Sequence, residues 1–153
     1  MIIELKVYTP SFQEHIGNYY VADLSYTASP QTVLANLKSS YAPILCFDKE
    51  QLVCFFVLDN GDDRLNYTQN QKSLLLRAFS TDSKYLKKGY ATTSLQLLSD
   101  FVRDYFPDTT DVYLGVNLKN EFAIRLYEKV GFVDTKRIFE GPKGPQKILK
   151  LAI

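Results

Sequence analysis

The chain has 153 residues, 46% of them hydrophobic, and a formal net charge of +1. That length and apolar content suffice for a single domain, residues 1–153, with a sizeable core. The balanced charge argues against a nucleic-acid-binding surface, and no run approaches the roughly eighteen apolar residues of a membrane span. The N-terminus lacks the basic stretch and long apolar run of a signal peptide, so we expect a cytoplasmic protein.

A strand is expected over residues 2–8. Ser11 then opens a helix, with Glu14 three residues later at a capping-box spacing. Ser29 and Pro30 mark the start of a second helix, because Ser is a favoured cap and Pro is favoured at the first helical position. Two helices therefore follow the first strand.

Two apolar runs within residues 43–58 flank four polar residues, 48–51, and predict a hairpin. The polar stretch 59–71 is expected to be a loop, whose acidic residues form a solvated turn or attract a cation. Residues 73–81 follow as a strand with a continuous apolar portion, which is typical of a strand covered on both faces.

The next helix is indicated by Ala91, Leu95, Leu98 and Val102, which recur at helical spacing, and Pro107 ends it. The two cysteines, Cys46 and Cys54, lie in adjoining apolar segments. With so few cysteines and no export signal, buried free thiols are expected. They lie too far from the only histidine, His15, to make a plausible zinc set, so no metal site is predicted.

The last part of the chain predicts a strand over residues 111–116, a helix over 120–129 and a final hairpin. The hairpin strands are 132–139 and 146–153, joined around residues 141–145. The complete order is βααβββαβαββ. This order predicts an α/β (α+β) fold, a mixed sheet with helices on its faces.

A loop that can bind phosphate precedes the helix that starts near Ala91. A helix N-terminus carries free N–H groups and about half a positive charge. Gly89 permits a tight turn and a close approach of a ligand to the backbone. The same residues also fit a plain helix entry with two solvated lysines. The candidate pyrophosphate-binding residues are Lys87, Lys88, Gly89, Tyr90, Ala91 and Thr92.

The segment from Asn120 to Phe132, NEFAIRLYEKVGF, predicts an amphipathic helix with a tyrosine on its buried side. Tyr127 is either a core residue or a proton donor. Asn120 is either a helix cap or a ligand-binding residue. Both this helix and the glycine loop follow strands, and ligands in such sheets bind beyond the carboxyl ends of the strands. If the two strands are neighbours, one ligand can touch both units.

These two units resemble the GNAT N-acetyltransferase superfamily over nearly the whole chain. LKKGYA stands at the loop Gln/Arg-x-x-Gly-x-Gly/Ala that binds the pyrophosphate of acetyl-CoA in that family, although Leu86 replaces the usual Gln or Arg. The helix matches the signature Asn-x-x-Ala-x-x-Leu-Tyr. The resemblance implies a mixed, mostly antiparallel twisted sheet of about seven strands with four helices. It also implies acetyl-CoA as co-substrate and no metal.

Further site roles come from the same resemblance. The strand end Phe79, Ser80 and Thr81 would pair through its backbone with the pantetheine arm. Asn120 would bind that arm, and Tyr127 would protonate the leaving thiolate. The strand-end amides can also polarise the thioester carbonyl. Catalysis would then be direct attack by a primary amine on the thioester.

An alkylamine has a pKa of about 10.4, so preparing it at pH 7 costs roughly 4–5 kcal/mol unless a base helps. The carboxylates that could take the proton, directly or through a water, are Glu14, Asp23, Asp82 and Glu121.

The acceptor is expected between the two N-terminal helices and the final hairpin. Tyr19, Tyr20 and Tyr26 give that region aromatic surface and Asp23 gives it charge. The pattern is similar to that of small bacterial polyamine acetyltransferases, and a polyamine would suit an acidic, aromatic cleft. A peptide, protein or amino-acid acceptor stays open, as does a non-catalytic CoA-binding regulatory module. A homodimer could form through the edge of the final hairpin, because residues 147–153 are an apolar strand near a terminus.

Overall fold

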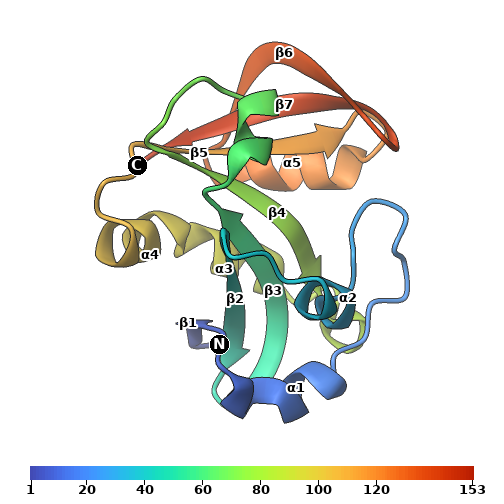
Figure 1. Ribbon diagram of the computed structural model, residues 1–153. Coiled ribbons are helices and arrows are strands. Elements are labelled where there is room, and N and C mark those ends of the chain that lie inside the picture. Colours follow the sequence, from blue (N-terminus) through green and yellow to red (C-terminus); the bar gives the residue numbers. More distant parts are fainter.

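The computed structural model describes residues 1–153 and has a seven-stranded sheet at its centre (Figure 1). In chain order the elements are β1 (Ile3–Val7), α1 (Gln13–Gly17), α2 (Pro30–Ala35), β2 (Tyr41–Asp48), β3 (Gln51–Asp59), β4 (Ser73–Thr81), α3 (Tyr90–Gln96), α4 (Leu98–Tyr105), β5 (Asp111–Asn117), α5 (Glu121–Lys129), β6 (Val133–Gly141) and β7 (Gly144–Ala152). The predicted element order and mostly antiparallel sheet are confirmed, with the one helix expected after residue 90 broken at Leu97 into α3 and α4.

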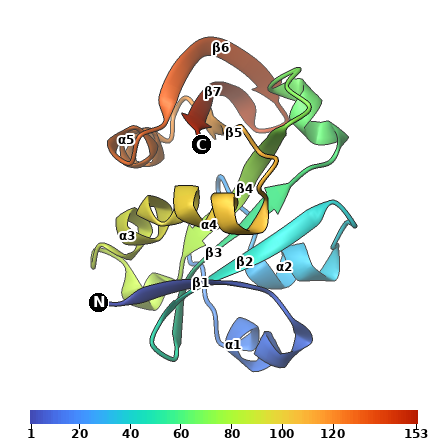
Figure 2. The same cartoon turned by 90° about the vertical axis from the view of Figure 1, so that its left-hand side faces the viewer.

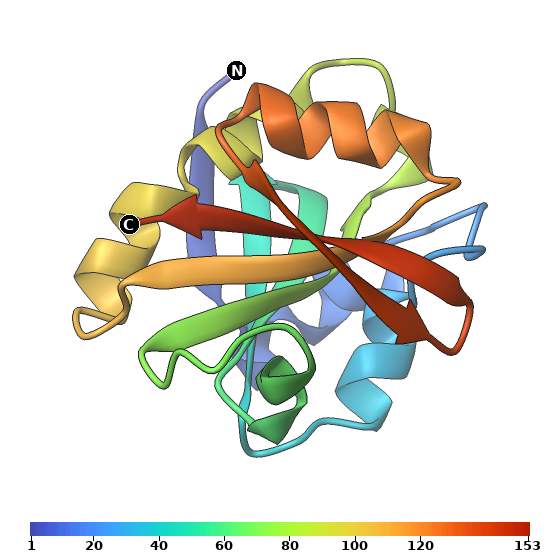
Figure 3. The ribbon, with the colours of Figure 1, turned by 90° about the horizontal axis from the view of Figure 1, so that it is seen from above.

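The strands are ordered β1-β2-β3-β4-β5-β7-β6, and helices cover both faces of the sheet. The larger core cluster packs under α3, α4 and α5, and a smaller one packs under α1 and α2. Figure 2 shows α3 and α4 on one side of strands β1 to β3, with α1 and α2 on the other. Seen from above, β6 and β7 form a strongly twisted hairpin across the top of the sheet (Figure 3). None of the helices is both long and apolar enough to cross a bilayer.

Strands β4 and β5 are parallel neighbours, as expected, but they stay together for only a short distance. Their register covers Ser73–Leu75 on β4 and Asp111–Tyr113 on β5. Both strands then continue and separate, which opens the sheet in its middle (Figure 1). The sheet therefore holds a gap at the carboxyl ends of these two strands.

A β-bulge in β4 accompanies this separation. The register with β3 shifts between Phe55 and Val57, so that two residues of β4, Ala78 and Phe79, oppose Phe56 alone. Ala78 has a φ of 56°, a left-handed conformation that is uncommon for a residue other than glycine. A bulge bends its strand and strengthens the local twist. The second half of β4 thus bends away from the direction of its first half.

The N-terminal helices differ from each other in how they begin. The Ser29 Oγ accepts a hydrogen bond from the Thr32 backbone N at 3.2 Å, so the predicted cap of α2 is confirmed. The predicted capping box of the first helix is wrong. Ser11 lies in a 3-10 turn, Pro10–Phe12, and its hydroxyl is 2.6 Å from the Thr9 hydroxyl. The preceding proline favours that tight turn, and α1 starts two residues later than Ser11.

Two other predictions concern the cysteines and the dimer edge. Cys46 and Cys54 face each other across β2 and β3 as buried free thiols, as expected.

The segment 147–153 does not form an edge, because β7 pairs with β5 on one side and β6 on the other. The outer strand of the final hairpin is β6, so the edge that the hairpin offers is β6 and not the segment 147–153, and the homodimer stays a prediction.

Tyr19 ties the N-terminal segment to the end of β4. Its side chain is only 4% exposed, and its hydroxyl donates to the Ser80 carbonyl at 2.9 Å. The hydroxyl also lies 2.8 Å from the Ser80 Oγ. Burial raises the pKa of this phenol well above its ordinary value, so it stays neutral and keeps the proton it donates. Tyr19 therefore fixes the strand end that borders the gap.

Tyr19→Phe is expected to lower the free energy of unfolding by about 1–3 kcal/mol, because the buried polar groups of Ser80 lose their partner. Urea unfolding measures this change, with Tyr20→Phe as the control, since Tyr20 is 58% exposed. Equal stability of the two variants would contradict the role assigned to the Tyr19 hydroxyl.

Candidate active site

A cavity of about 680 Å³ lies in the gap where β4 and β5 separate. Its wall includes the second half of β4, the second half of β5, the start of α5 and the turn between β6 and β7. On the other face it is lined by the segment that joins α1 to α2, and by α2 itself. The cavity therefore passes through the sheet, with α3 and α5 near one end and α1 and α2 near the other.

The predicted phosphate loop lies at the α3 end of this cavity. Lys87 and Gly89 both have positive φ, 62° and 83°, so the backbone curls immediately before α3 begins at Tyr90. A Cβ built on Gly89 would meet only the Met1 side chain, at 3.7 Å, so the space over the loop is open. Curled backbone of this kind, followed by a helix start, presents N–H groups to an anion. The loop thus fits a pyrophosphate.

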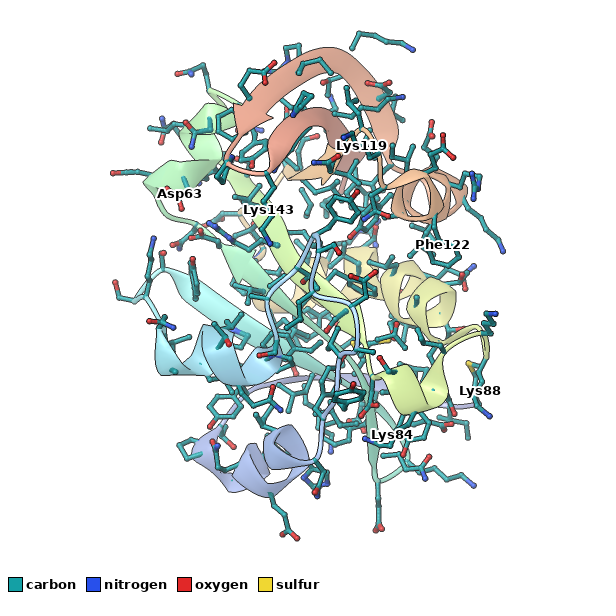
Figure 4. The ribbon with its side chains drawn as sticks, turned by 90° about the vertical axis from the view of Figure 1, so that its right-hand side faces the viewer. Asp63, Lys84, Lys88, Lys119, Phe122 and Lys143 are labelled. Atoms are coloured by element: carbon teal, nitrogen blue, oxygen red, sulfur yellow. The ribbon has the colours of Figure 1, made fainter.

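The side chains of the loop contribute unequally. Lys87 and Lys88 are exposed, and Figure 4 shows Lys88 at the outer edge of the molecule. Ala91 lines the cavity, whereas Thr92 does not reach it. The Tyr90 hydroxyl donates to an Asp48 oxygen at 2.7 Å, which commits that side chain to the β2–β3 turn. Only the backbone of Tyr90 is left for a ligand.

Leu86, which stands where the family pattern has Gln or Arg, also lines the cavity. It is 53% exposed, and Phe122 on the first turn of α5 is a second exposed apolar residue of the wall, at 72%. Phe122 and Lys88 lie toward the same side of the molecule in Figure 4. Leu86 can therefore offer a ligand apolar contact but no polar one.

The end of β4 borders the cavity with Phe79, Ser80 and Thr81. The Phe79 carbonyl accepts from the Thr27 hydroxyl at 3.3 Å, and the Thr81 hydroxyl lies 3.3 Å from the Cys54 sulfur. Ser80 is held by Tyr19. These contacts fix the strand end from the α1–α2 segment and from β3. Toward β5, no strand pairs with β4 beyond Leu75, so backbone groups on that side can bind an extended ligand.

Tyr127 lies on α5 and lines the cavity while being only 8% exposed. Its ring packs edge-on against Phe79 and Phe132, with ring centroids 6.3 Å and 5.6 Å away. Burial alone raises the pKa of the hydroxyl, with no charged or hydrogen-bonded neighbour contributing. Tyr127 is thus both a core residue and a neutral hydroxyl whose proton is free for a ligand in the cavity.

Asn120 begins α5 and serves as its cap. The side-chain oxygen accepts a hydrogen bond from the Ala123 backbone N at 3.3 Å. Asn120 also lines the cavity, and its amide nitrogen is not used in this cap. The capping interpretation is therefore confirmed, and both N–H donors of the side-chain amide remain available to a ligand.

Of the four carboxylates considered as bases, only Asp23 lines the cavity. Asp82 is 1% exposed and holds the Lys84 ammonium at 2.7 Å, while Glu14 and Glu121 lie outside the wall. Asp23 accepts hydrogen bonds from the Ser25 hydroxyl and backbone N at 2.6 Å and 3.0 Å. These bonds lower its pKa, which favours a permanently charged carboxylate over a base.

Of the three tyrosines expected to line the acceptor side, only one lies in the cavity wall. Tyr26 lines the cavity, Tyr20 is exposed outside it, and Tyr19 is buried against Ser80. The other aromatic residues of this half are Tyr41 and Tyr67, which the sequence did not single out.

Other cavity residues were also missed because no motif marks them. Gly115 on β5 is one of these, since a Cβ there would overlap Gln146 and the ring of Tyr67, whose hydroxyl donates to Gln146 at 2.9 Å. Arg77 and Lys143 are also in the wall. A charged residue inside the otherwise apolar run 74–79 was the one available signal for Arg77.

Comparison with known proteins identifies the family. The model of the acetyltransferase (GNAT) family matches residues 8–132. An uncharacterised N-acetyltransferase of Bacillus subtilis (strain 168), YbbJ, is 33% identical over 153 aligned residues, which cover 96% of this chain and 95% of that protein.

Solved structures share the fold at lower identity. Aminoglycoside acetyltransferase AAC(6')-Ib with coenzyme A and kanamycin has a TM-score of 0.77 at 18% identity, covering 99% of this chain and 95% of that one. The Escherichia coli ribosomal-protein-S18-alanine N-acetyltransferase has a TM-score of 0.71 at 18% identity, covering 99% and 94%. A spermidine N-acetyltransferase chimera from Vibrio cholerae and hSSAT has a TM-score of 0.67 at 16% identity, covering 98% and 95%. The chain belongs to the acetyltransferase (GNAT) family and is an acyltransferase.

Proposed function

We propose that this protein transfers the acetyl group of acetyl-CoA to a primary amine of a small molecule by direct attack. One observation carries the proposal: Tyr127 presents a neutral hydroxyl to a cavity that passes through the sheet between β4 and β5. A donor entering at the α3 end and an acceptor entering at the α1–α2 end can meet there. The relative YbbJ, named as an N-acetyltransferase, supports the reaction type.

Three parts of the chain would hold acetyl-CoA, which supplies an acetyl group activated as a thioester. The curled loop at Lys87–Gly89 and the start of α3 would bind the pyrophosphate through backbone N–H groups and the two lysine charges. The unpaired side of β4 at residues 79–81 would bind the pantetheine arm as a further strand. The amide nitrogen of Asn120 would donate to the same arm from the other wall.

In the reaction, the amine nitrogen of the acceptor bonds to the thioester carbonyl carbon and the carbon–sulfur bond breaks. Backbone N–H groups at the end of β4 would stabilise the charge that develops on the carbonyl oxygen. Tyr127 would donate its proton to the departing sulfur, and solvent would return a proton to the phenol. The proton lost by the amine leaves through the open acceptor end of the cavity.

The rival function is a CoA-binding regulatory module without catalysis. It requires the phosphate loop but not a tyrosine with an uncommitted hydroxyl between the two strands. Tyr127 therefore favours the enzyme. The expectation of a polyamine acceptor is weakened, because a polyamine suits an acidic cleft and Asp23 is the only carboxylate in the wall.

Tyr127→Phe is expected to lower kcat by about a hundredfold or more, the usual contribution of a general acid, with little change in acetyl-CoA affinity. Thiol release from acetyl-CoA with a panel of amines measures turnover, and calorimetry measures affinity. Tyr113→Phe is the matched control, because Tyr113 is equally buried, at 8%, but lies outside the cavity wall. Unchanged kcat in a step limited by chemistry would remove Tyr127 from the acid role. Binding without turnover on any amine would favour the regulatory module.

Gly89→Glu is expected to abolish CoA binding, because it places a negative side chain over the phosphate loop. Calorimetry with CoA measures the loss. Gly17→Glu is the control, since a Cβ at Gly17 meets nothing within 4 Å and its φ is not positive. Wild-type affinity in the Gly89 variant would overturn the loop as the phosphate site.

The turnover rate, measured as a function of pH, should not fall with rising pH below about pH 10, the ordinary pKa of tyrosine. The acid must be protonated to act, and burial raises the pKa of Tyr127, so its proton stays in place over a wider range. The rate should instead rise with pH as the acceptor amine loses its proton. A falling limb below pH 10 that disappears in Tyr127→Phe would show that the phenol ionises too early for this role.

A further inference from the structure

The acceptor half of the cavity carries more positive than negative side chains. The charged residues of the wall are Asp23, Lys38, Arg77 and Lys143, three cations and one anion. An acceptor with several ammonium groups would meet like charges there, although Asp59 and Asp63 outside the wall pair with Arg77 and Lys38 and offset part of that charge. The wall therefore disfavours a polycation and favours a ligand that carries a negative charge beside its amine.

Arg77 is held in a fixed position with donors to spare. Its Nη1 donates to an Asp59 oxygen at 3.0 Å and to an Asp63 oxygen at 2.9 Å, and its guanidinium carbon lies 5.3 Å from the centre of the Tyr41 ring. A guanidinium has five N–H donors, and these contacts use only one nitrogen. The remaining donors form a planar fork that matches a carboxylate.

The two carboxylates that hold Arg77 are not part of the cavity wall. Asp59 is 1% exposed, and Asp63 lies on the 3-10 turn Asp62–Asn66, where Figure 4 shows it on the same side of the view as Lys143. In this acidic loop, Asp63 thus forms an ion pair with the Arg77 side chain. Because Arg77 lines the cavity and its two counter-ions do not, a ligand there can reach the guanidinium.

Two lysines add positive charge around the same half. The Lys38 ammonium is 3.7 Å from Asp63 and 5.8 Å from the centre of the Tyr41 ring. The Lys143 ammonium donates to the Leu24 carbonyl at a long 3.4 Å, across from the β6–β7 turn to the α1–α2 segment. That weak contact leaves Lys143 free to approach a ligand.

The cavity wall has few groups that could take a proton from the acceptor, and this also bears on which amine it suits. At pH 7 only about one alkylamine in a few thousand is neutral, against roughly one in ten α-amino groups of a peptide. A cavity whose one carboxylate is Asp23, already hydrogen-bonded to Ser25, suits the α-amino group of a peptide better than the more basic amines of a free amino acid or a diamine.

We propose that the acceptor is an amine that also carries a carboxylate, such as an amino acid or a short peptide with a free C-terminus, and that Arg77 binds that carboxylate. This inference rests on the acetyltransferase function proposed above. Arg77 precedes Phe79 by two residues, so their Cα atoms lie at most about 7 Å apart, and less across the bulge at Ala78. A molecule of amino-acid or dipeptide size spans the distance from Arg77 to the end of β4.

The test compares acceptors that differ only in the carboxylate. Thiol release from acetyl-CoA is measured with lysine and cadaverine, ornithine and putrescine, and alanyl-alanine and its C-terminal amide. Spermidine and kanamycin serve as polycations. In the wild type, kcat/KM should be at least tenfold higher for the carboxylate-bearing member of one or more pairs.

Arg77→Gln should reduce that ratio by about ten- to hundredfold, mainly through KM, because a charge-assisted pair is lost. Arg77→Lys should recover part of it. Since Arg77→Gln also deprives Asp59 of a partner, Lys143→Gln on the exposed turn is a second variant, expected to lower the ratio severalfold. Lys129→Gln, at an exposed site on α5 outside the wall, is the control and should leave the ratio unchanged.

The outcomes separate the two proposals. A preference for carboxylates that falls in the Arg77 and Lys143 variants supports the inference. Turnover that favours the decarboxylated amines, spermidine or kanamycin overturns it and leaves the acetyltransferase function standing. A preference unchanged in both variants overturns the role of Arg77. CoA binding with no thiol release for any amine overturns the proposed function itself.

Discussion

The site depends on one constraint, the early parting of β4 from β5. The two strands share three pairs of residues and then separate, while β4 keeps its pairing with β3 and β5 keeps its pairing with β7. Each strand thus stays anchored on its outer side and presents an unpaired backbone on its inner side. Buried backbone groups without partners are costly, so the gap is a place where a ligand can complete the sheet. The bulge at Ala78 lets β4 bend while it remains paired with β3 on both sides of the bulge.

The walls of the gap are held in place by contacts within the protein. Tyr19 and Thr27 hold the end of β4 from the N-terminal segment, and the Phe79 and Phe132 rings hold Tyr127. Burial has a chemical consequence here, because it keeps the phenol of Tyr127 neutral without assistance from a nearby charge. The same packing that stabilises the core therefore keeps a protonated hydroxyl at the cavity, as the proposed acid role requires. Core residue and acid are compatible descriptions of this side chain.

The two ends of the cavity differ in chemistry. At one end the curled backbone, two lysines and apolar Leu86 and Phe122 suit a phosphorylated chain with an apolar arm. At the other end the wall includes Arg77, whose guanidinium is held by Asp59 and Asp63 from outside the wall. In the proposed reaction, a sheet open in its middle would let acetyl-CoA and the acceptor approach from opposite faces and meet between β4 and β5.

Local patterns in the sequence determined the element order, the Ser29 cap, the bounds of β4 and the helix that carries Tyr127, because propensity, capping and periodicity act over a few residues. They also indicated the glycine loop and the Asn–Tyr helix. The Ser11 capping box was wrong because of the preceding proline, and the strand order placed β6, not the segment 147–153, at the edge of the final hairpin. Only the tertiary structure brought Arg77, Lys143 and Asp23 to one cavity. Those residues come from separate elements, and the distances between them are set by packing and strand separation, which no local pattern records.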